Sequence, residues 1–275
     1  MASYRQGNDR RSPGPGRRGS GAASPEHAAS VGHRHRLEDE RAEWLWGWRP
    51  VLAALANPAR ARPKRLLATA DRARELGERG AAAGVLEIVE AGALARIAPP
   101  GAPHQGVALR IPPLRATPLD ELAANPGGFL VMLDQVTNPQ NVCAIFRSAA
   151  AFGARGLIVQ DRHSPPLAGA LAKAAAGAID ALPHARETNL SRALERLDAL
   201  GWRAVGLDGA APASLAEVLD ARPTVLVLGA EGEGLRRLVA EHCDVLAGIP
   251  MPGGFESLNV SAAAAVALYE VSRRG

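Results

Sequence analysis

The second half of the chain alternates short apolar runs with helix-like stretches, and this alternation constrains the fold more than any other feature. Strand-like runs lie at residues 129–133, 156–159, 202–207, 224–228 and 245–251, with a weaker candidate at 181–184. Helical patterns lie between or after them, at 167–176, 190–200 and 257–272. The alternation predicts an α/β fold, with a mostly parallel sheet covered by helices on both faces. Ligands of such sheets bind beyond the carboxyl ends of the strands, so chemistry is expected in the loops there.

The preceding segment predicts a smaller α/β domain. Its pattern gives a helix start at 50–56, a strand at 65–68, a helix at 71–76, an apolar run at 85–89 and a strand at 106–111. A proline-punctuated linker follows at 112–118, because proline cannot donate a backbone hydrogen bond and the residue before it avoids helix. We therefore expect one domain at 43–115 and a second at 119–275.

Residues 1–42 are rich in Gly, Ser, Pro, Arg and His and have no apolar periodicity, so we expect a disordered tail. The tail holds eight Arg against five Asp or Glu, which accounts for most of the net charge of +4. Two interpretations stay open for this basic tail. It contacts phosphates, or it is a solvated extension, which composition favours.

Composition limits the class of protein further. At 275 residues with 47% hydrophobic side chains, the chain is able to bury a sizeable core. It has neither a run of about eighteen apolar residues nor the apolar segment of a secretory signal, so we expect a soluble cytoplasmic protein without a membrane partner. Cys143 and Cys243 lie near no CxxC pair or His cluster. We expect two free thiols, no disulfide framework and no metal site.

The first of three polar loops follows the apolar run that ends at Leu133. Asn141 and Arg147 stand six positions apart, near the start of a helix whose other positions are apolar. The planar guanidinium of Arg147 suits a phosphate, and the amide of Asn141 suits a backbone group or a hydroxyl. An N-cap Asn followed by a surface Arg explains the segment equally well.

The second loop, Gly229–Leu235, follows the run at 224–228. Its glycines allow backbone amides to approach a ligand, and Glu231 is able to accept hydrogen bonds or meet a cation. The glycine order is GxxGxG, which differs from the dinucleotide fingerprint, and the absence of GK[ST] excludes a P-loop. A plain glycine-rich turn before a helix is the alternative.

The third loop runs from Ile249 to Ser261 and precedes an alanine-rich helix. Here Ser257, Asn259 and Ser261 place polar groups around apolar neighbours, an arrangement that suits an adenine or ribose edge beside an apolar wall. Helix capping explains one of these three polar residues but not all of them.

Together, Asn138–Ser148, Gly229–Leu235 and Ile249–Ser261 resemble three motifs of the SpoU (TrmH-like) family of RNA 2′-O-ribose methyltransferases, which belongs to the SPOUT superfamily. The resemblance covers about residues 119–275, and residues 43–115 look like the small RNA substrate-binding domain of that family, above all at 101–109. There are two departures from the family pattern. Cys143 replaces a usual glycine, and Arg49 stands where His or Asn is common.

The resemblance implies a parallel sheet with a deep C-terminal trefoil knot, a small domain like ribosomal protein L30e, and a homodimer whose interface completes the site. S-adenosylmethionine is the implied cofactor, held by Gly229, Ile249 and Leu258. The implied catalytic and RNA-facing residues are Asn141, Arg147, Glu231, Ser257 and Asn259. Arg147 is expected to clamp a phosphate, because guanidinium holds its proton to about pH 12 and above, which disfavours a role as general base.

Within the family, the chain most resembles bacterial enzymes that methylate a guanosine ribose in 23S rRNA. A transfer-RNA 2′-O-methyltransferase is the first alternative. Outside the family, a non-catalytic RNA-binding or ribosome-assembly protein would not need the polar residues of all three loops, and a dinucleotide-binding oxidoreductase would need a different glycine order. In the small domain the candidate RNA contacts are Arg60, Arg62, Lys64 and Arg65, with a solvated charge run as the alternative.

Overall fold

The computed structural model describes residues 42–81, 84–162, 164–165, 167, 175–253 and 257–274, which belong to one compact unit. The expected disordered tail therefore lies outside the described residues, except for Ala42, and so does most of the helix predicted at 167–176. Within the described ranges, no helix has both the length and the apolar character needed to cross a membrane.

The first sheet has four strands in the order β1-β4-β2-β3. Strand β4 pairs antiparallel with β1 and β2, while β2 and β3 are parallel. The strands are β1 (Glu43–Trp46), β2 (Arg65–Ala68), β3 (Leu86–Ile88) and β4 (Val107–Ile111). The helices that accompany them are α2 (Trp48–Ala56), α3 (Ala70–Glu78) and α4 (Ala91–Ala95). Strand β1 was not predicted, because its two tryptophans and one glutamate give no clear alternation.

The second sheet has six strands in the order β10-β8-β9-β5-β6-β7, and every neighbouring pair is parallel. The predicted α/β class with a parallel sheet is therefore confirmed. Its strands are β5 (Phe129–Leu133), β6 (Gly156–Gln160), β7 (His184–Glu187), β8 (Arg203–Leu207), β9 (Thr224–Leu228) and β10 (Val245–Ala247). The four central strands are mostly apolar on both sides, as strands covered on both faces must be.

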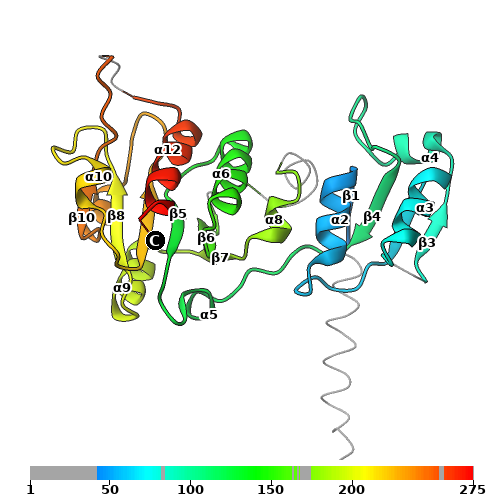
Figure 1. The fold of residues 1–275 in the computed structure, drawn as a ribbon, viewed down its shortest axis with the longest axis horizontal. Helices are drawn as coiled ribbons and strands as arrows, with labels where there is room; N and C mark the ends of the chain where they lie inside the picture. Colours follow the sequence, from blue (N-terminus) through cyan, green and yellow to red (C-terminus); the bar gives the residue numbers. More distant parts are fainter. Residues whose placement is uncertain are drawn as a thin grey trace, which may run out of the picture. The chain divides into compact units, whose positions relative to one another are not determined.

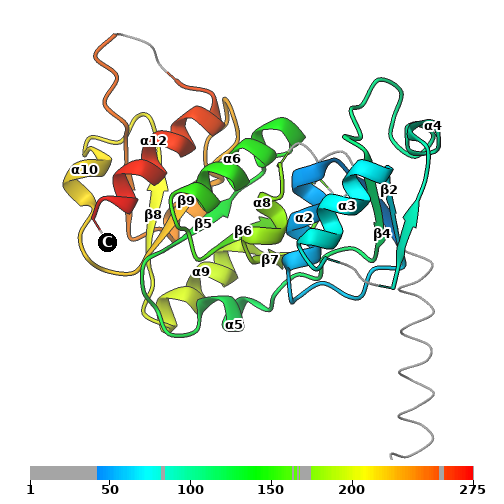
Figure 2. The same cartoon turned by 45° about the vertical axis from the view of Figure 1, so that its right-hand side comes forward.

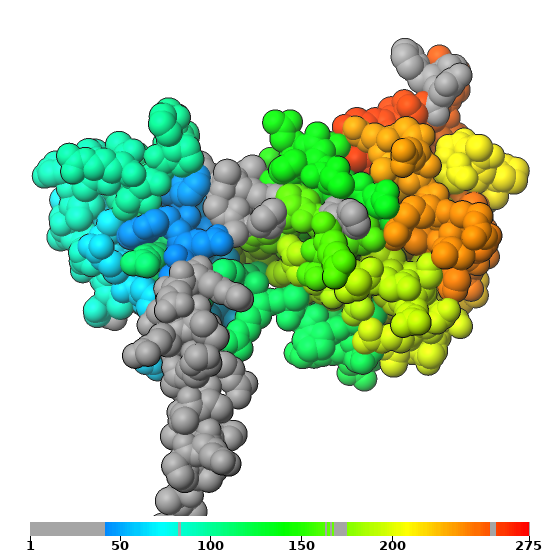
Figure 3. All heavy atoms as spheres, turned by 180° about the vertical axis from the view of Figure 1, so that it is seen from behind, coloured from blue at the N-terminus to red at the C-terminus, as the bar shows by residue number. Residues whose placement is uncertain are grey.

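Helices cover both faces of this sheet (Figures 1 and 2). One face packs on α6 (Pro139–Ala151), α8 (Ala178–Ala181), α10 (Leu215–Val218) and α12 (Val260–Ser272). The other face packs on α5 (Leu119–Ala123), α9 (Leu190–Ala199) and α11 (Arg237–Glu241). Alternate residues of each strand enter the two cores, so Val131 and Leu133 face α6 and α12 while Leu130 and Met132 face α9. In the space-filling view from behind, the green, yellow and orange residues of this part of the chain lie side by side on one surface (Figure 3).

Local sequence sets where the helices begin. Asn138 accepts a hydrogen bond from the backbone of Gln140, and Pro139 occupies the first helical turn of α6. Asn189 caps α9 in the same way, and Ser214 with Glu217 forms a capping box for α10. These residues satisfy amide groups that the first turn of a helix leaves without partners.

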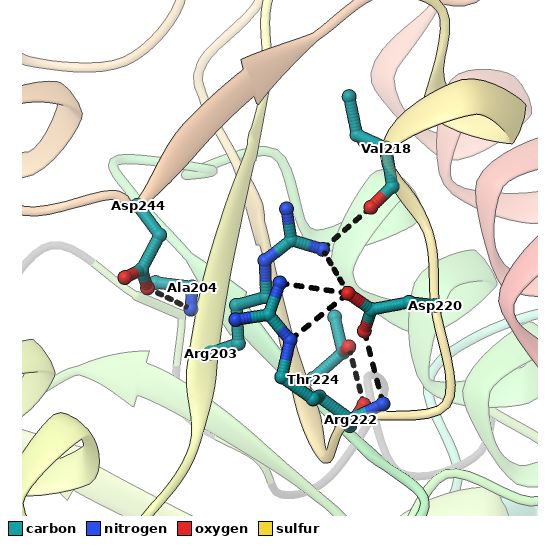
Figure 4. Close-up of polar contacts among 7 residues, drawn as sticks. All are labelled: Arg203, Ala204, Val218, Asp220, Arg222, Thr224 and Asp244. Carbon is teal, nitrogen blue, oxygen red and sulfur yellow. Dashed lines mark hydrogen bonds and ion pairs between the residues drawn. The ribbon is translucent and has the colours of Figure 1, made fainter.

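A cluster of charged side chains fixes the amino-terminal ends of β8 and β9 (Figure 4). Asp220 accepts hydrogen bonds from the backbone and guanidinium of Arg222 and lies 3.5 Å from the guanidinium of Arg203. Asp244 accepts a 2.7 Å bond from the backbone of Ala204. The cluster lies at the edge opposite to the carboxyl ends of the strands, so it stabilises the sheet without contributing to a ligand site there.

Two predicted elements need correction. The strand predicted at 245–251 ends at Ala247, because Pro250 and Pro252 cannot continue a ladder. The weak strand candidate at 181–184 is displaced: Ala181 ends helix α8, and strand β7 begins only at His184. Both errors come from reading apolar residues as strand where proline or a short helix intervenes.

One arginine of the predicted RNA contact is buried instead. The guanidinium of Arg60 bonds both carboxylate oxygens of Asp180 at 2.6 and 3.1 Å, and the two side chains are only 4% and 2% exposed. Arg60 also donates to the carbonyl of Pro112. Nearby, Arg65 forms a bidentate pair with Glu87 across β2 and β3. Arg60 is therefore not available to RNA, and Arg65 is already paired.

Candidate active site

A cavity of about 780 Å³ lies beyond the carboxyl ends of β8, β9 and β10. The last residues of these strands, Leu207, Leu228 and Ala247, form its floor. The loops after β9 and β10 form its walls, and they include Gly229, Glu231, Ile249 and Leu258. The cavity thus lies at the edge of the sheet where the sequence predicted a ligand, and its size is typical of a site for a small molecule or cofactor.

The glycine-rich loop folds back on itself at the cavity wall. The backbones of Ala230 and Gly234 exchange two 3.0 Å hydrogen bonds, which close a tight loop. A methyl group on Gly229 would overlap the backbone of Gly234 and Leu235. Only glycine fits at this position, because the returning chain occupies the space that a side chain needs. The simple-turn interpretation is thus partly correct, but the turn also lines the cavity.

Three side chains from the three polar loops form a closed hydrogen-bonded triangle. Asn141 Nδ2 donates to Glu231 Oε1 at 2.9 Å. Asn259 Nδ2 donates to Asn141 Oδ1 at 3.1 Å and also to Glu231 Oε1. The backbone N–H of Val260 donates to the same glutamate oxygen at 3.2 Å. Residues separated by up to 118 positions therefore meet at one point beside the cavity.

Asn259 has two roles at once. Its Oδ1 caps helix α12 by accepting hydrogen bonds from the backbone and hydroxyl of Ser261 and from the backbone of Ala262. Its amide nitrogen belongs to the triangle described above. The capping interpretation was therefore correct for Asn259, and the third loop carries a further polar function in addition. Ser257 and Leu258 precede the helix, are exposed and line the cavity.

The N-cap alternative for Asn141 is wrong. Asn138 is the N-cap of α6, and Asn141 lies inside the first turn, with only 7% of its surface exposed. A buried amide must find partners to offset its desolvation, and Asn141 finds them in Glu231 and Asn259. Its side chain is therefore held in a single orientation at the site.

Arg147 is the one predicted catalytic residue that neither belongs to this triangle nor lines the cavity. It lies on an exposed part of α6, and no residue of the described chain forms a hydrogen bond or ion pair with its side chain. Six residues advance a helix by about 9 Å and 1.7 turns, so Arg147 and Asn141 leave α6 in different directions. Arg147 does not line the cavity.

An ion pair between a buried carboxylate and a partly exposed arginine, which the sequence did not indicate, supports the glycine-rich loop. Asp134, fully buried at the end of β5, accepts hydrogen bonds from the Nε and the backbone N–H of Arg236 at 2.7 and 2.9 Å. Arg236 follows the glycine-rich loop directly, so the pair ties the exit of the loop to the central strand. The available signal was an acidic residue immediately after an apolar strand.

Both cysteines are free thiols, as predicted. Burial raises the pKa of the Cys143 thiol, although Arg147 opposes the effect. Burial, together with Asp244 and Asp134, raises the pKa of Cys243 to about 12. Neither thiol is activated as a nucleophile, since a reactive cysteine needs a lowered pKa.

The comparisons with known proteins identify the family. The family model described as the SpoU rRNA Methylase family matches residues 128–269, which include all three loops of the site. The chain belongs to this family. It is 43% identical over 175 residues to proteins called uncharacterized tRNA/rRNA methyltransferase from Mycobacterium avium and Mycobacterium ulcerans. The match covers 62% of this chain but only 57% and 56% of those relatives.

Solved SpoU structures share the fold over nearly the whole chain. The SpoU methyltransferase AviRb from Streptomyces viridochromogenes, at 28% identity, has a TM-score of 0.72 over 89% of this chain and 94% of its own. An rRNA methyltransferase from Sinorhizobium meliloti, solved with AdoMet bound, has the same TM-score at 26% identity over 88% and 90%. AviRb was also solved with AdoMet, which is the cofactor of the SpoU family.

Proposed function

We propose that this chain transfers a methyl group from S-adenosylmethionine to a ribose 2′-hydroxyl of RNA, most specifically to a guanosine of 23S rRNA. The observation that carries the proposal is the triangle of Asn141, Glu231 and Asn259 beside the cavity. All three residues belong to the sequence motifs of the SpoU family. In the structure these three residues, which come from three separate motifs, meet at one point beside the cavity.

The cavity fits the proposed cofactor. Its volume is suitable for a nucleoside-sized ligand, and its walls combine apolar side chains such as Ile249 and Leu258 with glycine backbone. A methyl group at Gly229 would overlap the returning backbone of Gly234, so glycine keeps this part of the wall free of a side chain. When bound, S-adenosylmethionine supplies the methyl group and a sulfonium leaving group, so the transfer itself requires no metal. Gly229, Ile249 and Leu258 are the proposed residues that hold it.

The triangle positions the reacting hydroxyl. Asn259 uses both amide hydrogens, on Glu231 and on Asn141, whereas Asn141 uses only one of its own. Asn141 therefore keeps one N–H for a ribose oxygen, and Glu231 holds both amides in place through a single oxygen. Ser257 lies on the cavity wall, where its hydroxyl is able to contact either substrate. The main contribution of these residues is orientation, since an in-line displacement depends steeply on geometry.

Arg147 acts on the RNA in this proposal. Its guanidinium remains charged at any physiological pH, so it serves better as a clamp on a phosphate than as a base. The same charge stabilises the oxyanion that develops on the ribose as the proton leaves. Its exposed place on α6, outside the cavity, agrees with a contact made to bound RNA or across a subunit interface.

We propose a homodimer, and helix α12 supports it. The helix is mostly apolar and carries a single charged residue, Glu270, yet Val266 and Tyr269 remain 47% and 52% exposed in the single chain. Helices that are apolar all round are normally buried. Val266→Glu should therefore give a monomer by light scattering, whereas Glu270→Gln on the same helix should leave the dimer intact. A wild-type monomer would contradict the proposal.

The rRNA assignment rests on the residues that precede the six-stranded sheet, which we call the catalytic sheet because the candidate active site lies at its edge. The Sinorhizobium meliloti rRNA methyltransferase aligns over 88% of this chain, and the SpoU methyltransferase AviRb over 89%, so both alignments include the four-stranded sheet. The tRNA modifying enzyme of Aquifex aeolicus aligns over only 57%, with a TM-score of 0.50. We accordingly propose that residues 43–115 form an RNA-binding domain of the L30e type, and residues 119–275 a methyltransferase domain with a trefoil knot.

The deciding experiment uses tritiated S-adenosylmethionine and separated 23S rRNA, 16S rRNA and tRNA from cells that lack the gene. Label should enter 23S rRNA, and alkaline hydrolysis should leave one resistant dinucleotide that contains guanosine. Glu231→Gln should reduce incorporation strongly, while Glu241→Gln, on the exposed face of α11, should not. If label enters tRNA alone, the substrate is tRNA, and the alternative of a tRNA 2′-O-methyltransferase replaces the rRNA assignment. No label in any RNA would favour a non-catalytic RNA-binding protein.

A further inference from the structure

Charge is divided unevenly along the sequence of the two domains. Residues 42–115 contain eleven Lys or Arg and six Asp or Glu, whereas residues 116–275 contain thirteen Lys or Arg and seventeen Asp or Glu. The residues of the four-stranded sheet and its helices are therefore positive, and those of the catalytic sheet are negative. A polyanion such as RNA should bind first to the positive part, because phosphate contacts dominate its affinity.

Within the positive part, one cluster combines cations with an aromatic ring. The guanidinium of Arg72 lies 4.5 Å and that of Arg79 lies 5.7 Å from the centre of the Trp48 ring. Glu75 pairs with both arginines, at 2.5 and 3.7 Å. The side chain of Arg79 is still 54% exposed, so the cluster has two fixed cations but only one neutralising charge. Attraction between a cation and an aromatic face holds the guanidiniums in place.

A strained loop completes the cluster. Gln105 has φ of 56°, a left-handed conformation that is uncommon for a residue with a side chain. Its Oε1 accepts a hydrogen bond from the backbone of Trp48, and its carbonyl accepts one from Arg72. The next residue, Gly106, has φ of 77°, and a methyl group there would lie 2.8 Å from the Thr69 hydroxyl. Exposed strain that is held by specific contacts is typical of functional sites.

We propose that the surface formed by Trp48, Arg72, Arg79 and Gln105 binds an unpaired segment of the RNA substrate. The two arginines contact phosphates. The aromatic and guanidinium groups around Trp48, together with the side-chain amide of Gln105, receive a base that is not stacked in a helix. Unpaired RNA suits this surface because such bases are free to stack on aromatic or guanidinium groups. The inference rests on the proposed function and deepens it. It replaces the predicted contact at residues 60–65, where Arg60 and Arg65 are paired internally.

The test measures binding of the full-length protein to a fluorescein-labelled single-stranded 20-nucleotide RNA and to a duplex of the same length. Arg79→Ala should raise the Kd for the single strand about three- to tenfold at 0.1 M salt and reduce the slope of log K against log salt by about 0.7. The matched control is Arg74→Ala. Arg74 lies on α3, the helix that Arg79 follows directly, with a side chain 70% exposed and paired only to exposed Asp71. It should leave Kd and slope unchanged.

Equal effects of Arg79→Ala and Arg74→Ala on the single strand would overturn the proposal. An equal loss of duplex binding in Arg79→Ala would overturn the preference for unpaired RNA. Trp48→Ala provides a second test of RNA binding. Its result is interpreted only if the variant has the melting temperature of the wild type. Methyl transfer separates the two proposals: Arg79→Ala should raise KM for RNA and leave kcat unchanged. If Arg79→Ala weakens RNA binding but the wild-type protein methylates no RNA, the proposed RNA-binding surface stands and the proposed methyltransferase activity is rejected.

Discussion

At the scale of single residues, His184 is held neutral by its surroundings. It lies at the start of β7 with 2% of its surface exposed, beside Phe146, and its Nδ1 has no hydrogen-bond partner. Burial, with Arg186 and Arg60 adding repulsion, lowers the pKa of His184 from 6.5 to about 4. The unfolded chain therefore binds a proton at higher pH than the folded chain does.

It follows that His184 makes folding stability fall as pH decreases below 6.5. Between pH 7.5 and 5.0 the loss should be roughly 2 kcal/mol, because each pKa unit corresponds to about 1.4 kcal/mol. Urea unfolding of the wild type and of His184→Gln at both pH values measures it. The variant should lose less stability over this range. An identical pH dependence for the two proteins would show that His184 is not buried as a neutral group.

For Arg147, we expect that Arg147→Ala abolishes methyl transfer and leaves the affinity for S-adenosylmethionine nearly unchanged. The reason is its position on α6, away from the cavity. Arg147→Lys should recover little activity, because lysine keeps the charge but loses the planar fork that holds two oxygens. Methyl incorporation and calorimetry with the cofactor test both statements. A selective loss of cofactor affinity would place Arg147 at the other half of the site.

Individual site residues were only partly predictable from the sequence. Asn141, Glu231 and Asn259 stood out because polar residues follow apolar strands there, and the structure brings them together. Gly229, Ile249, Ser257 and Leu258 line the cavity, and their roles toward cofactor and RNA stay predictions. The Asp134–Arg236 pair was missed, because a sequence does not show which partner a buried carboxylate finds across 102 positions.

At the scale of elements, the loop after β9 should tolerate no side chain at its first residue. Gly229→Ala should weaken binding of S-adenosylmethionine by at least tenfold, because the new methyl overlaps the returning backbone at Gly234 and the loop has to open. Gly232→Ala is the control, since nothing lies within 4 Å of its added methyl; its φ of 82° adds a backbone strain that Gly229 does not share. Calorimetry with S-adenosylmethionine measures the affinity of both variants. Equal affinities in the two variants would argue against the tight loop.

The boundaries of strands and helices were predicted correctly where the local sequence pattern is clear. Strands β2, β5 and β9 lie at the predicted residues, since each is a continuous apolar run with clear ends. Short helices such as α5 and α11 were not predicted, because five residues give too little periodicity to distinguish a helix from a loop. The order of the strands was also not predictable, because parallel pairing depends on contacts between distant segments.

At the scale of the whole molecule, the Arg60–Asp180 pair joins the loop after α2 to helix α8. Arg60→Met should cost about 3–5 kcal/mol of stability, because it leaves a buried carboxylate without its charged partner. The double variant with Asp180→Leu should recover most of that loss. Arg65→Met, which breaks a half-exposed pair, should unfold close to the wild-type urea midpoint. A loss in the double variant as large as in the single one would contradict this account.

The strand order has a consequence for the way the chain is made. Strand β5 pairs with β9, so Phe129 meets Thr224 in the middle of the sheet. During synthesis, β5, β6 and β7 leave the ribosome long before β9 exists, and they expose an apolar, unpaired edge until it arrives. Non-local parallel pairing of this kind folds slowly and risks aggregation on the way. Asn259 follows every strand of this sheet, so the triangle forms only after those strands have been made, and a product that stops before Asn259 would contain most of the sheet but no complete triangle.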